Sequence, residues 1–271
     1  MKQIIFLCLL WVFTNVVFGQ VDTVEVYSEV MDQTIPNLII TPKDYTEESV
    51  ELPVLYLLHG AGGYFSNWFF RVPEIEQYAT DYNMIIVCPD GDKTSWYIDS
   101  PIDSTSQYES YITRELVPVI DQNYRTVKHK SGRAITGLSM GGHGAFYLAF
   151  RNQDIWGAAG SMSGGVNIIP FAEEWNIDEI LGPYTENKEN WEANTVVNLT
   201  YLLNGDLKII FDCGKEDFFA EVNKELHEKL MSEGVPHEYT VRPGKHNWEY
   251  WRNSIKHHLL YFDDFFKNHL N

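Results

Sequence analysis

The chain has 271 residues, of which 44% are hydrophobic and 14% aromatic, and its formal net charge is -18 from 38 acidic and 20 basic side chains. This composition supplies a large core for one α/β domain and excludes an intrinsically disordered chain. The negative charge repels nucleic-acid backbones and anionic membranes at long range, so we expect neither as a partner, and it favours neutral substrates.

The N-terminus has the pattern of a secretory signal peptide. Lys2 precedes an apolar run from Ile4 to Phe18, which at about 15 residues is short for a membrane span of roughly 20. Val17 and Gly19 suit the positions before a cleavage site, so we predict cleavage after Gly19. Residues 1–19 would then be the signal peptide and residues 20–271 a single secreted or periplasmic domain without a membrane anchor. An uncleaved anchor is the alternative.

The first elements of the predicted domain are extended. Thr23 to Val30 and Asn37 to Thr41 are expected to form antiparallel edge strands. Pro53 to Leu58 is a continuous apolar run, which is typical of a strand buried on both faces. It ends in His59-Gly60-Ala61-Gly62-Gly63. Such a glycine-rich loop could cradle a phosphate, but no dinucleotide or P-loop pattern follows, so an oxyanion-binding loop is the better interpretation.

A helix, a buried strand and a second helix are predicted next. The helix covers Val72 to Asp81, and the strand covers Met84 to Cys88. Apolar residues then recur at helical spacing between Ser106 and Tyr124. Pro118 lies inside this segment and is expected to kink the helix or to mark its last turns.

Gly137-Leu138-Ser139-Met140-Gly141 matches the G-x-S-x-G pattern of a nucleophile elbow. Arg133 to Thr136 before it can form a short buried strand, and Gly142 to Phe150 after it has the small and apolar residues of a buried helix. This is the strand, turn and helix that the motif requires, whereas the bare pattern can arise by chance. We therefore predict that Ser139 is a nucleophile.

The remaining segments continue the alternation, with one interruption. A strand over Ile155 to Met162 is followed by residues 166–206, a stretch rich in Glu, Asn, Trp and Tyr that is predicted to be an insertion, such as a lid, unless it has its own helices. The last predicted elements are a strand over Leu207 to Phe211, a helix over Phe218 to Glu233, a strand over His237 to Val241 and a helix to about His269. Alternating strands and helices indicate a mostly parallel sheet with helices on both faces.

Cys88 and Cys213 each end an apolar strand-like run. In the expected strand order these two strands are several places apart, which is too far for a disulfide bond. We predict two free and mostly buried thiols.

A serine nucleophile needs a base and an acid that orients the base. In folds with a nucleophile elbow, the acid and then the base follow the serine on loops after late strands. Asp217 and His246 meet both conditions. Glu216 and Asp212 are rivals for the acid, and eight other histidines compete with His246, among them His59 in the glycine-rich loop and His143 one helical turn beyond Ser139.

Negative charge that develops on a carbonyl oxygen during acyl transfer needs preorganised N–H donors. The residue after the nucleophile supplies one, here Met140, and the glycine-rich loop supplies the other, here Ala61. Both are backbone roles. No metal-ligand cluster or cofactor motif is present in the pattern, so we expect no metal and no cofactor.

Several segments together resemble the esterase D-type branch of the α/β hydrolases, which includes feruloyl, acetyl and tributyrin esterases, S-formylglutathione hydrolases and, distantly, the antigen 85 mycolyltransferases. They are His59 to Gly63, Pro89-Asp90-Gly91, Ser95-Trp96-Tyr97, Asp99-Ser100-Pro101, Gly137 to Gly142, Gly214 to Asp217 and His246-Asn247-Trp248. The resemblance implies an α/β-hydrolase fold, the triad Ser139, Asp217 and His246, and the oxyanion donors Ala61 and Met140.

The substrate is less closely defined than the chemistry. Aromatic residues on the loops near the predicted site could stack on a sugar or an aromatic acyl group, namely Phe65, Trp68, Trp96, Tyr97 and Trp248. With the predicted secretion, this favours removal of feruloyl or acetyl groups from plant polysaccharide or oligosaccharides. An acyltransferase, a thioesterase similar to S-formylglutathione hydrolase and a non-catalytic binding protein are the alternatives. The oligomeric state stays open.

Overall fold

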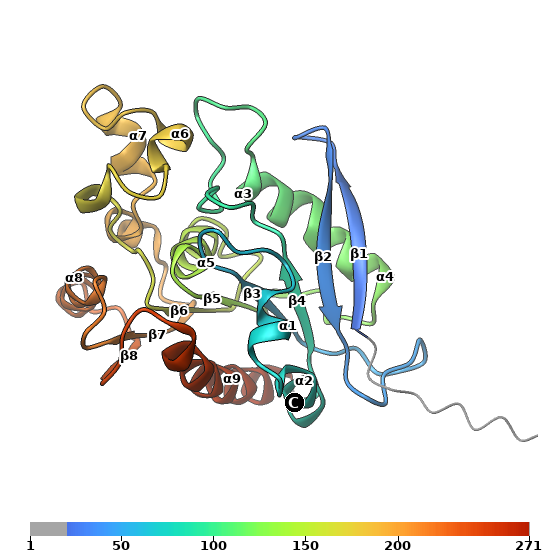
Figure 1. Cartoon of the computed structure of the whole chain (residues 1–271). Helices are drawn as coiled ribbons and strands as arrows, with labels where there is room; N and C mark the ends of the chain where they lie inside the picture. Colours follow the sequence, from blue (N-terminus) through green and yellow to red (C-terminus); the bar gives the residue numbers. More distant parts are fainter. Residues whose placement is uncertain (1–20, 271) are drawn as a thin grey trace, which may run out of the picture.

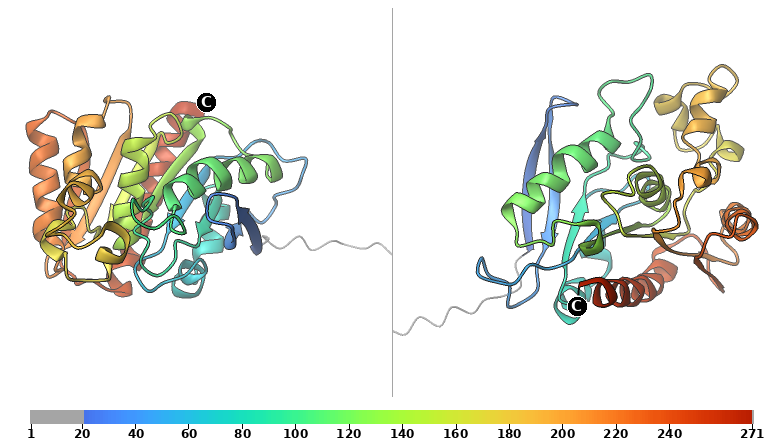
Figure 2. Two further views of the ribbon diagram at one scale, coloured as in Figure 1. Left: turned by 90° about the horizontal axis from the view of Figure 1, so that it is seen from above. Right: turned by 180° about the vertical axis from the view of Figure 1, so that it is seen from behind.

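Residues 21–270 are described by the computed structural model, so the predicted signal peptide lies outside the described residues. The described part contains an eight-stranded sheet with the strand order β1-β2-β4-β3-β5-β6-β7-β8. Helices cover both of its faces (Figure 1, Figure 2). This is the α/β-hydrolase architecture that the sequence predicts, with a mostly parallel sheet.

The N-terminal strands pair as an antiparallel hairpin. β1 (Val21–Ser28) and β2 (Gln33–Ile40) run antiparallel, with Val26 opposite Ile35. β2 also pairs antiparallel with β4 (Ile85–Pro89). Of these two strands, β1 is at an edge of the sheet and β2 is not, so the prediction of an edge position for the second strand is wrong. The burial of Leu38, Ile39 and Ile40 agrees with an interior position.

The remaining strands are parallel and carry the loops of the candidate site at their carboxyl ends. They are β3 (Val54–Leu58), β5 (Arg133–Gly137), β6 (Ala158–Met162), β7 (Lys208–Gly214) and β8 (Glu238–Arg242). β3 and β5 are buried throughout because both faces of the sheet are covered. β6 begins later than predicted, since Ile155 and Trp156 form a turn with Asn152.

Two hydrophobic clusters separate along the two faces of the sheet. On one face pack α1 (Asn67–Arg71), α2 (Ile75–Asp81) and the long α9 (Trp248–Leu270), while α5 (Met140–Arg151) and α8 (Ala220–Ser232) belong to the other. The sequence predicts α2, α5, α8 and α9 but not α1, whose five residues are too few for a periodic signal.

The helical segment around Pro118 combines three conformations. α3 (Tyr108–Ser110) continues into a π-helical stretch, Tyr111–Leu116, and then into α4 (Val117–Asn123). Pro118 lies in the first turn of α4. A proline lacks the N–H that an α-helix interior uses, and the wider preceding turn lets the helix pass it without ending. Of the two expectations for Pro118, a kink or the last turns of the helix, the structure agrees with the second, because the helical segment ends at Asn123.

The segment 166–206 before the acid-bearing strand has its own short helices. It contains 3₁₀ turns at Ile169–Phe171 and Val196–Leu202, together with α6 (Ile177–Leu181) and α7 (Lys188–Ala193). Trp191 and Leu199 of this segment are buried in the main core. The insertion is therefore packed onto the domain, and its motion as a lid stays a prediction.

Cys88 and Cys213 are both free and buried, and their strands β4 and β7 are separated in the sheet by β3, β5 and β6.

Among residues 21–270, none of the helices combines the length and the apolar character that crossing a membrane requires.

Candidate active site

Ser139 occupies a sharp turn between β5 and α5. Its backbone has φ 56° and ψ -119°, a conformation that costs a residue with a side chain about 1–3 kcal/mol. Close packing holds the turn in place. A Cβ on Gly137 would lie 2.4 Å from the carbonyl oxygen of Gly141, and a Cβ on Gly141 would lie 2.5 Å from the carbonyl oxygen of His59. These glycines give the turn the geometry of a nucleophile elbow.

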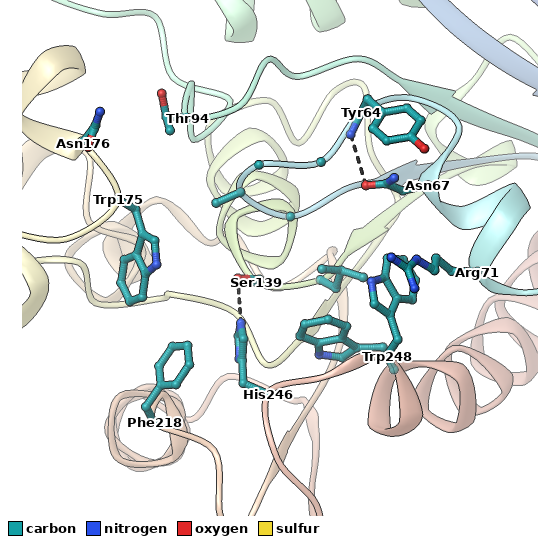
Figure 3. Close-up of a pocket in the computed structure, with 16 residues that line it drawn as sticks. Tyr64, Asn67, Arg71, Thr94, Ser139, Trp175, Asn176, Phe218, His246 and Trp248 are labelled. Carbon is teal, nitrogen blue, oxygen red and sulfur yellow. Dashed lines mark hydrogen bonds between the residues drawn. The ribbon is translucent and has the colours of Figure 1, made fainter.

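Ser139, His246 and Asp217 form one chain of hydrogen bonds. Nε2 of His246 lies 2.9 Å from the Ser139 hydroxyl oxygen (Figure 3), and Nδ1 lies 2.9 and 3.0 Å from the two carboxylate oxygens of Asp217. An ionised carboxylate only accepts hydrogen bonds. Nδ1 is therefore the donor, which leaves Nε2 free to accept the serine proton.

Among the rival acids, Asp217 alone reaches His246. The side chain of Asp217 is fully buried and also accepts a hydrogen bond from the Phe219 N–H at 2.9 Å. The carboxylate of Glu216 instead accepts from the Gly244 N–H at 2.7 Å, and the Glu216 N–H donates to the Gly244 carbonyl at 3.0 Å. Glu216 thus ties the acid loop to the loop that carries His246.

Asp212, the third candidate acid, belongs to a buried network below the site. Its carboxylate lies 3.0 Å from Nη2 of Arg242 and 3.0 Å from Nε2 of His258, and it accepts from the Ser254 hydroxyl. Burial opposes ionisation of Asp212, but His258 and Arg242 hold the pKa of its carboxyl below the usual range. His258 continues the network to Thr136 of β5 at 2.9 Å. The network therefore connects the strands that carry the nucleophile and the acid.

One predicted oxyanion donor, Met140, follows Ser139 in the chain, and the other, Ala61, belongs to the glycine-rich loop, whose Gly60 packs against Ser139. Met140 is the first residue of α5, whose first N–H groups have no acceptor within the helix. Ala61 belongs to a turn that the Gly63 N–H closes onto the Gly60 carbonyl at 3.0 Å. In the described part of the chain, neither the Ala61 nor the Met140 N–H has a backbone acceptor. Both donors are thus available to a ligand.

Two buried side chains fix the oxyanion loop. Nδ1 of His59 donates to the Gly60 carbonyl at 2.9 Å, and Nε2 accepts from the Gly91 N–H at 2.9 Å. Burial lowers the pKa of His59, which keeps this imidazole neutral. The Tyr97 hydroxyl accepts from the His59 N–H at 3.1 Å and lies 3.2 Å from the His59 carbonyl. His59 and Tyr97 therefore hold the backbone of the oxyanion loop in place.

Ser139 and His246 open into a cavity of about 700 Å³ (Figure 3). Of the five aromatic residues predicted to contact substrate, only Trp248 lines it. The sequence prediction missed Tyr64, Trp175 and Phe218, which do line the cavity. The rings of Trp175 and Phe218 stack 5.6 Å apart, and Phe218 lies 4.2 Å from the His246 ring. Phe218 directly follows Asp217 in the sequence, and this position could have predicted its place in the cavity.

The other four aromatic residues do not line the cavity, and the prediction of substrate contact is wrong for the three of them that are buried, Trp68, Trp96 and Tyr97. Trp68 is fully buried and donates to the Leu58 carbonyl, and Trp96 is buried against His143 at 5.3 Å. Tyr97 is buried below the oxyanion loop, and half-buried Phe65 packs on the cluster of α1 and α2. Burying large aromatic surfaces stabilises the loops more than leaving them in the cavity would.

His143 is also buried and does not reach Ser139. Its ring nitrogens lie 3.1 Å from the Trp96 carbonyl and 2.9 Å from the Asn194 carbonyl. Burial lowers the pKa of His143 to about 4, although both carbonyls favour its protonated form. His143 therefore links α5 to the insertion. Within residues 21–270, no three histidine, cysteine, aspartate or glutamate side chains are grouped as metal ligands.

Comparison with known proteins finds similarity to esterases. The family model described as "Putative esterase" matches residues 28–262. An esterase of Mycobacterium tuberculosis, Esterase Rv1288, is 27% identical over 235 residues, which cover 77% of this chain and 51% of that protein. The chain thus spans about half the length of this relative. An acetyl esterase of Caldicellulosiruptor saccharolyticus is 24% identical over 258 residues, which cover 84% of this chain and 92% of that protein.

A solved structure agrees with these matches. A ferulic acid esterase has a TM-score of 0.79 to this chain and is 27% identical to it. The alignment covers 92% of this chain and 99% of that structure.

Proposed function

The chain belongs to the esterase family, and from that premise we propose that it is a carboxylic ester hydrolase that acts through an acyl-enzyme on Ser139, with His246 as base and Asp217 as acid. The observation that carries this proposal is the continuous chain of hydrogen bonds from Asp217 through His246 to Ser139. The elbow, the orienting acid and the base supply every group that acyl transfer to a serine requires.

Acylation follows from the tautomer of His246. The Ser139 oxygen attacks the ester carbonyl carbon while Nε2 of His246 accepts the hydroxyl proton, and the carbonyl oxygen becomes an oxyanion that the Ala61 and Met140 N–H groups stabilise. The bond to the alcohol oxygen then breaks. His246 transfers its proton to that oxygen, so the alcohol leaves neutral and Ser139 carries the acyl group.

Deacylation repeats these steps with water. His246 accepts a proton from the water that attacks the acyl-enzyme, and the proton returns to Ser139 when the acid leaves. An acyltransferase with the same triad must keep water from its acyl-enzyme. Here the side of the cavity next to His246 is in contact with solvent, because Phe218 is 51% exposed. Exposure of this side supports hydrolysis rather than transfer.

For the substrate, we propose feruloyl or acetyl esters of plant polysaccharide or oligosaccharides. The aromatic wall of Trp175 and Phe218 beside the base suits a planar acyl group or a sugar face. The names of two similar proteins, an acetyl esterase and a ferulic acid esterase, support the same acyl groups. Secretion is part of the proposal and rests on the pattern of residues 1–19.

Hydrolysis of p-nitrophenyl acetate and of methyl ferulate tests the proposal. We expect turnover of at least one ester by the wild-type protein, loss of that turnover in Ser139→Ala, and labelling of Ser139 by a fluorophosphonate probe. An inert wild-type protein whose Ser139 is not labelled would contradict the esterase mechanism. Turnover of the model ester without release of ferulate or acetate from a plant oligosaccharide would contradict the substrate only.

A further inference from the structure

The charge of the candidate pocket differs from the charge of the chain. The full sequence has 38 acidic and 20 basic side chains, but none of the 16 described residues that line the pocket is acidic. Arg71 is the permanently charged member of that lining. An acidic protein therefore presents a cation, without a carboxylate beside it, to whatever enters the pocket.

Arg71 is the last residue of α1, and its side chain is exposed. Its guanidinium lies 6.0 Å from the centre of the Trp248 ring, which is fixed in turn by an edge contact with the buried Trp68 at 5.1 Å. Within residues 21–270, Arg71 has no carboxylate within ion-pair distance, and the side chain that donates to its carbonyl is another arginine, Arg252. A guanidinium held over an aromatic ring keeps its donors available for a planar anion.

A second donor lies on the same face of α1. Asn67 precedes Arg71 by four residues, one helical turn, and both line the pocket (Figure 3). The Asn67 carbonyl oxygen accepts from the Tyr64 N–H at 3.1 Å, which directs its amide N–H₂ away from that bond. In the described part of the chain, this N–H₂ group has no acceptor. Two donors on one helix face suit a carboxylate, which accepts at both oxygens.

The opposite side of the pocket is uncharged and aromatic. In Figure 3, Trp175 and Phe218 lie across Ser139 from Arg71 and Trp248. A ligand that spans the pocket therefore meets an apolar surface at one end and a cation with an amide at the other. The net charge of the chain favours neutral substrates at long range, but this effect is screened beyond about 8 Å at physiological salt, whereas Arg71 acts by contact.

We propose that the enzyme selects esters that carry a carboxylate group, which Arg71 and Asn67 bind while the apolar part of the substrate lies against Trp175 and Phe218. This inference rests on the proposed function of the same site. The carboxylate can belong to the acid that is transferred to Ser139 or to the alcohol that leaves, for example a uronic acid sugar. Arg71 is a specificity residue in this proposal and takes no part in the proton transfers.

Two matched pairs of esters test the proposal and distinguish the two sources of the carboxylate. On the alcohol side, 4-acetoxybenzoate is compared with 4-acetoxybenzamide. On the acyl side, p-nitrophenyl hydrogen adipate is compared with p-nitrophenyl methyl adipate. The readout is the ratio of kcat/KM for the anionic ester to kcat/KM for its neutral partner, measured at about 0.15 M salt.

For at least one pair of esters, Arg71→Gln is expected to lower this ratio about threefold to tenfold, because the lost contact is a charge-assisted hydrogen bond at an exposed site. The change should come mainly from a higher KM for the anionic ester. Arg71→Lys should retain part of the preference. The control is Arg114→Gln, which removes the same charge from an exposed side chain outside the pocket and should leave the ratio unchanged.

The pair that responds identifies the side of the ester that carries the carboxylate. A ratio that stays within twofold of wild type in Arg71→Gln for both pairs would overturn the inference. In that case the neutral esters are still hydrolysed and the proposed function stands. An enzyme that hydrolyses neither member of either pair would instead contradict the proposed function.

Discussion

Replacing Asp217 by asparagine should abolish most of the activity without unfolding the protein. The Asp217 carboxylate accepts two kinds of hydrogen bond, from Nδ1 of His246 at 2.9 and 3.0 Å and from the Phe219 N–H at 2.9 Å. An asparagine in this place keeps its carbonyl oxygen on the Phe219 N–H, so its amide N–H₂ faces the imidazole. Nδ1 must then accept, which puts the proton on Nε2.

An imidazole with a proton on Nε2 cannot accept the proton of Ser139. The loss expected from a wrong tautomer in a serine triad is about 10³- to 10⁴-fold in kcat, or about 4 to 5.5 kcal/mol of barrier. The assay is kcat for p-nitrophenyl acetate, together with the thermal midpoint of unfolding. We expect the midpoint to change little, because the packing around residue 217 is retained.

Glu216→Gln is the matched control for this prediction. A glutamine carbonyl can still accept from the Gly244 N–H, which the Glu216 carboxylate contacts at 2.7 Å, so kcat should fall less than about fivefold. If Asp217→Asn keeps kcat within tenfold of wild type, or if Glu216→Gln loses as much, the assignment of the acid is wrong.

Three further changes test other parts of the site. Asp212→Asn should lower the free energy of unfolding by about 3–5 kcal/mol in urea denaturation at pH 7, because Arg242 loses the buried carboxylate with which it pairs. A loss below about 1 kcal/mol would refute this role. Ala61→Pro should lower kcat about 10²- to 10³-fold by removing an oxyanion donor, whereas Ala61→Gly keeps the N–H and should lose much less. Proline suits this place, since Gly62 at φ 69° makes residues 60–63 a type II turn. Because burial lowers the pKa of His143 to about 4 while the unfolded value is about 6.5, the unfolded chain alone binds a proton between these pH values. Stability should therefore fall, by about 3 kcal/mol at most, as the pH drops through this window, and His143→Gln should reduce the fall in urea titrations at pH 7 and 4.5.

The reactive residues could be predicted from the sequence because their signals are local. The G-x-S-x-G pattern needs only a buried strand before it and a helix after it, and both are visible in the apolar run before Ser139 and in the small residues after it. The acid and the base follow from chain order. Loop position favours Asp217 over Glu216, and the structure agrees, because the Asp217 carboxylate contacts Nδ1 of His246 whereas that of Glu216 accepts from the Gly244 N–H.

The substrate contacts could not be predicted in this way because aromatic side chains serve the core and the cavity equally well. Trp96 and Tyr97 stand on a loop at the correct edge of the sheet, yet both are buried. Their backbones have φ 53° and 60°, a left-handed conformation that bulky residues adopt rarely and at a cost of about 1–3 kcal/mol each. No periodic pattern in the sequence predicts such a turn.

The strained pair at Trp96 and Tyr97 has a consequence for catalysis. The left-handed turn directs the Tyr97 hydroxyl to the backbone of His59 and the Trp96 ring to His143. The loop that carries Trp96 and Tyr97 therefore contacts both the oxyanion loop and α5. Burial of the two aromatic side chains offsets the backbone strain. In our proposal, substrate recognition is left to pocket residues that the strands do not position, such as Trp175 in the insertion and Arg71 at the end of a five-residue helix. These short segments can change without disturbing the triad, which explains why the sequence defines the reaction more closely than the ester.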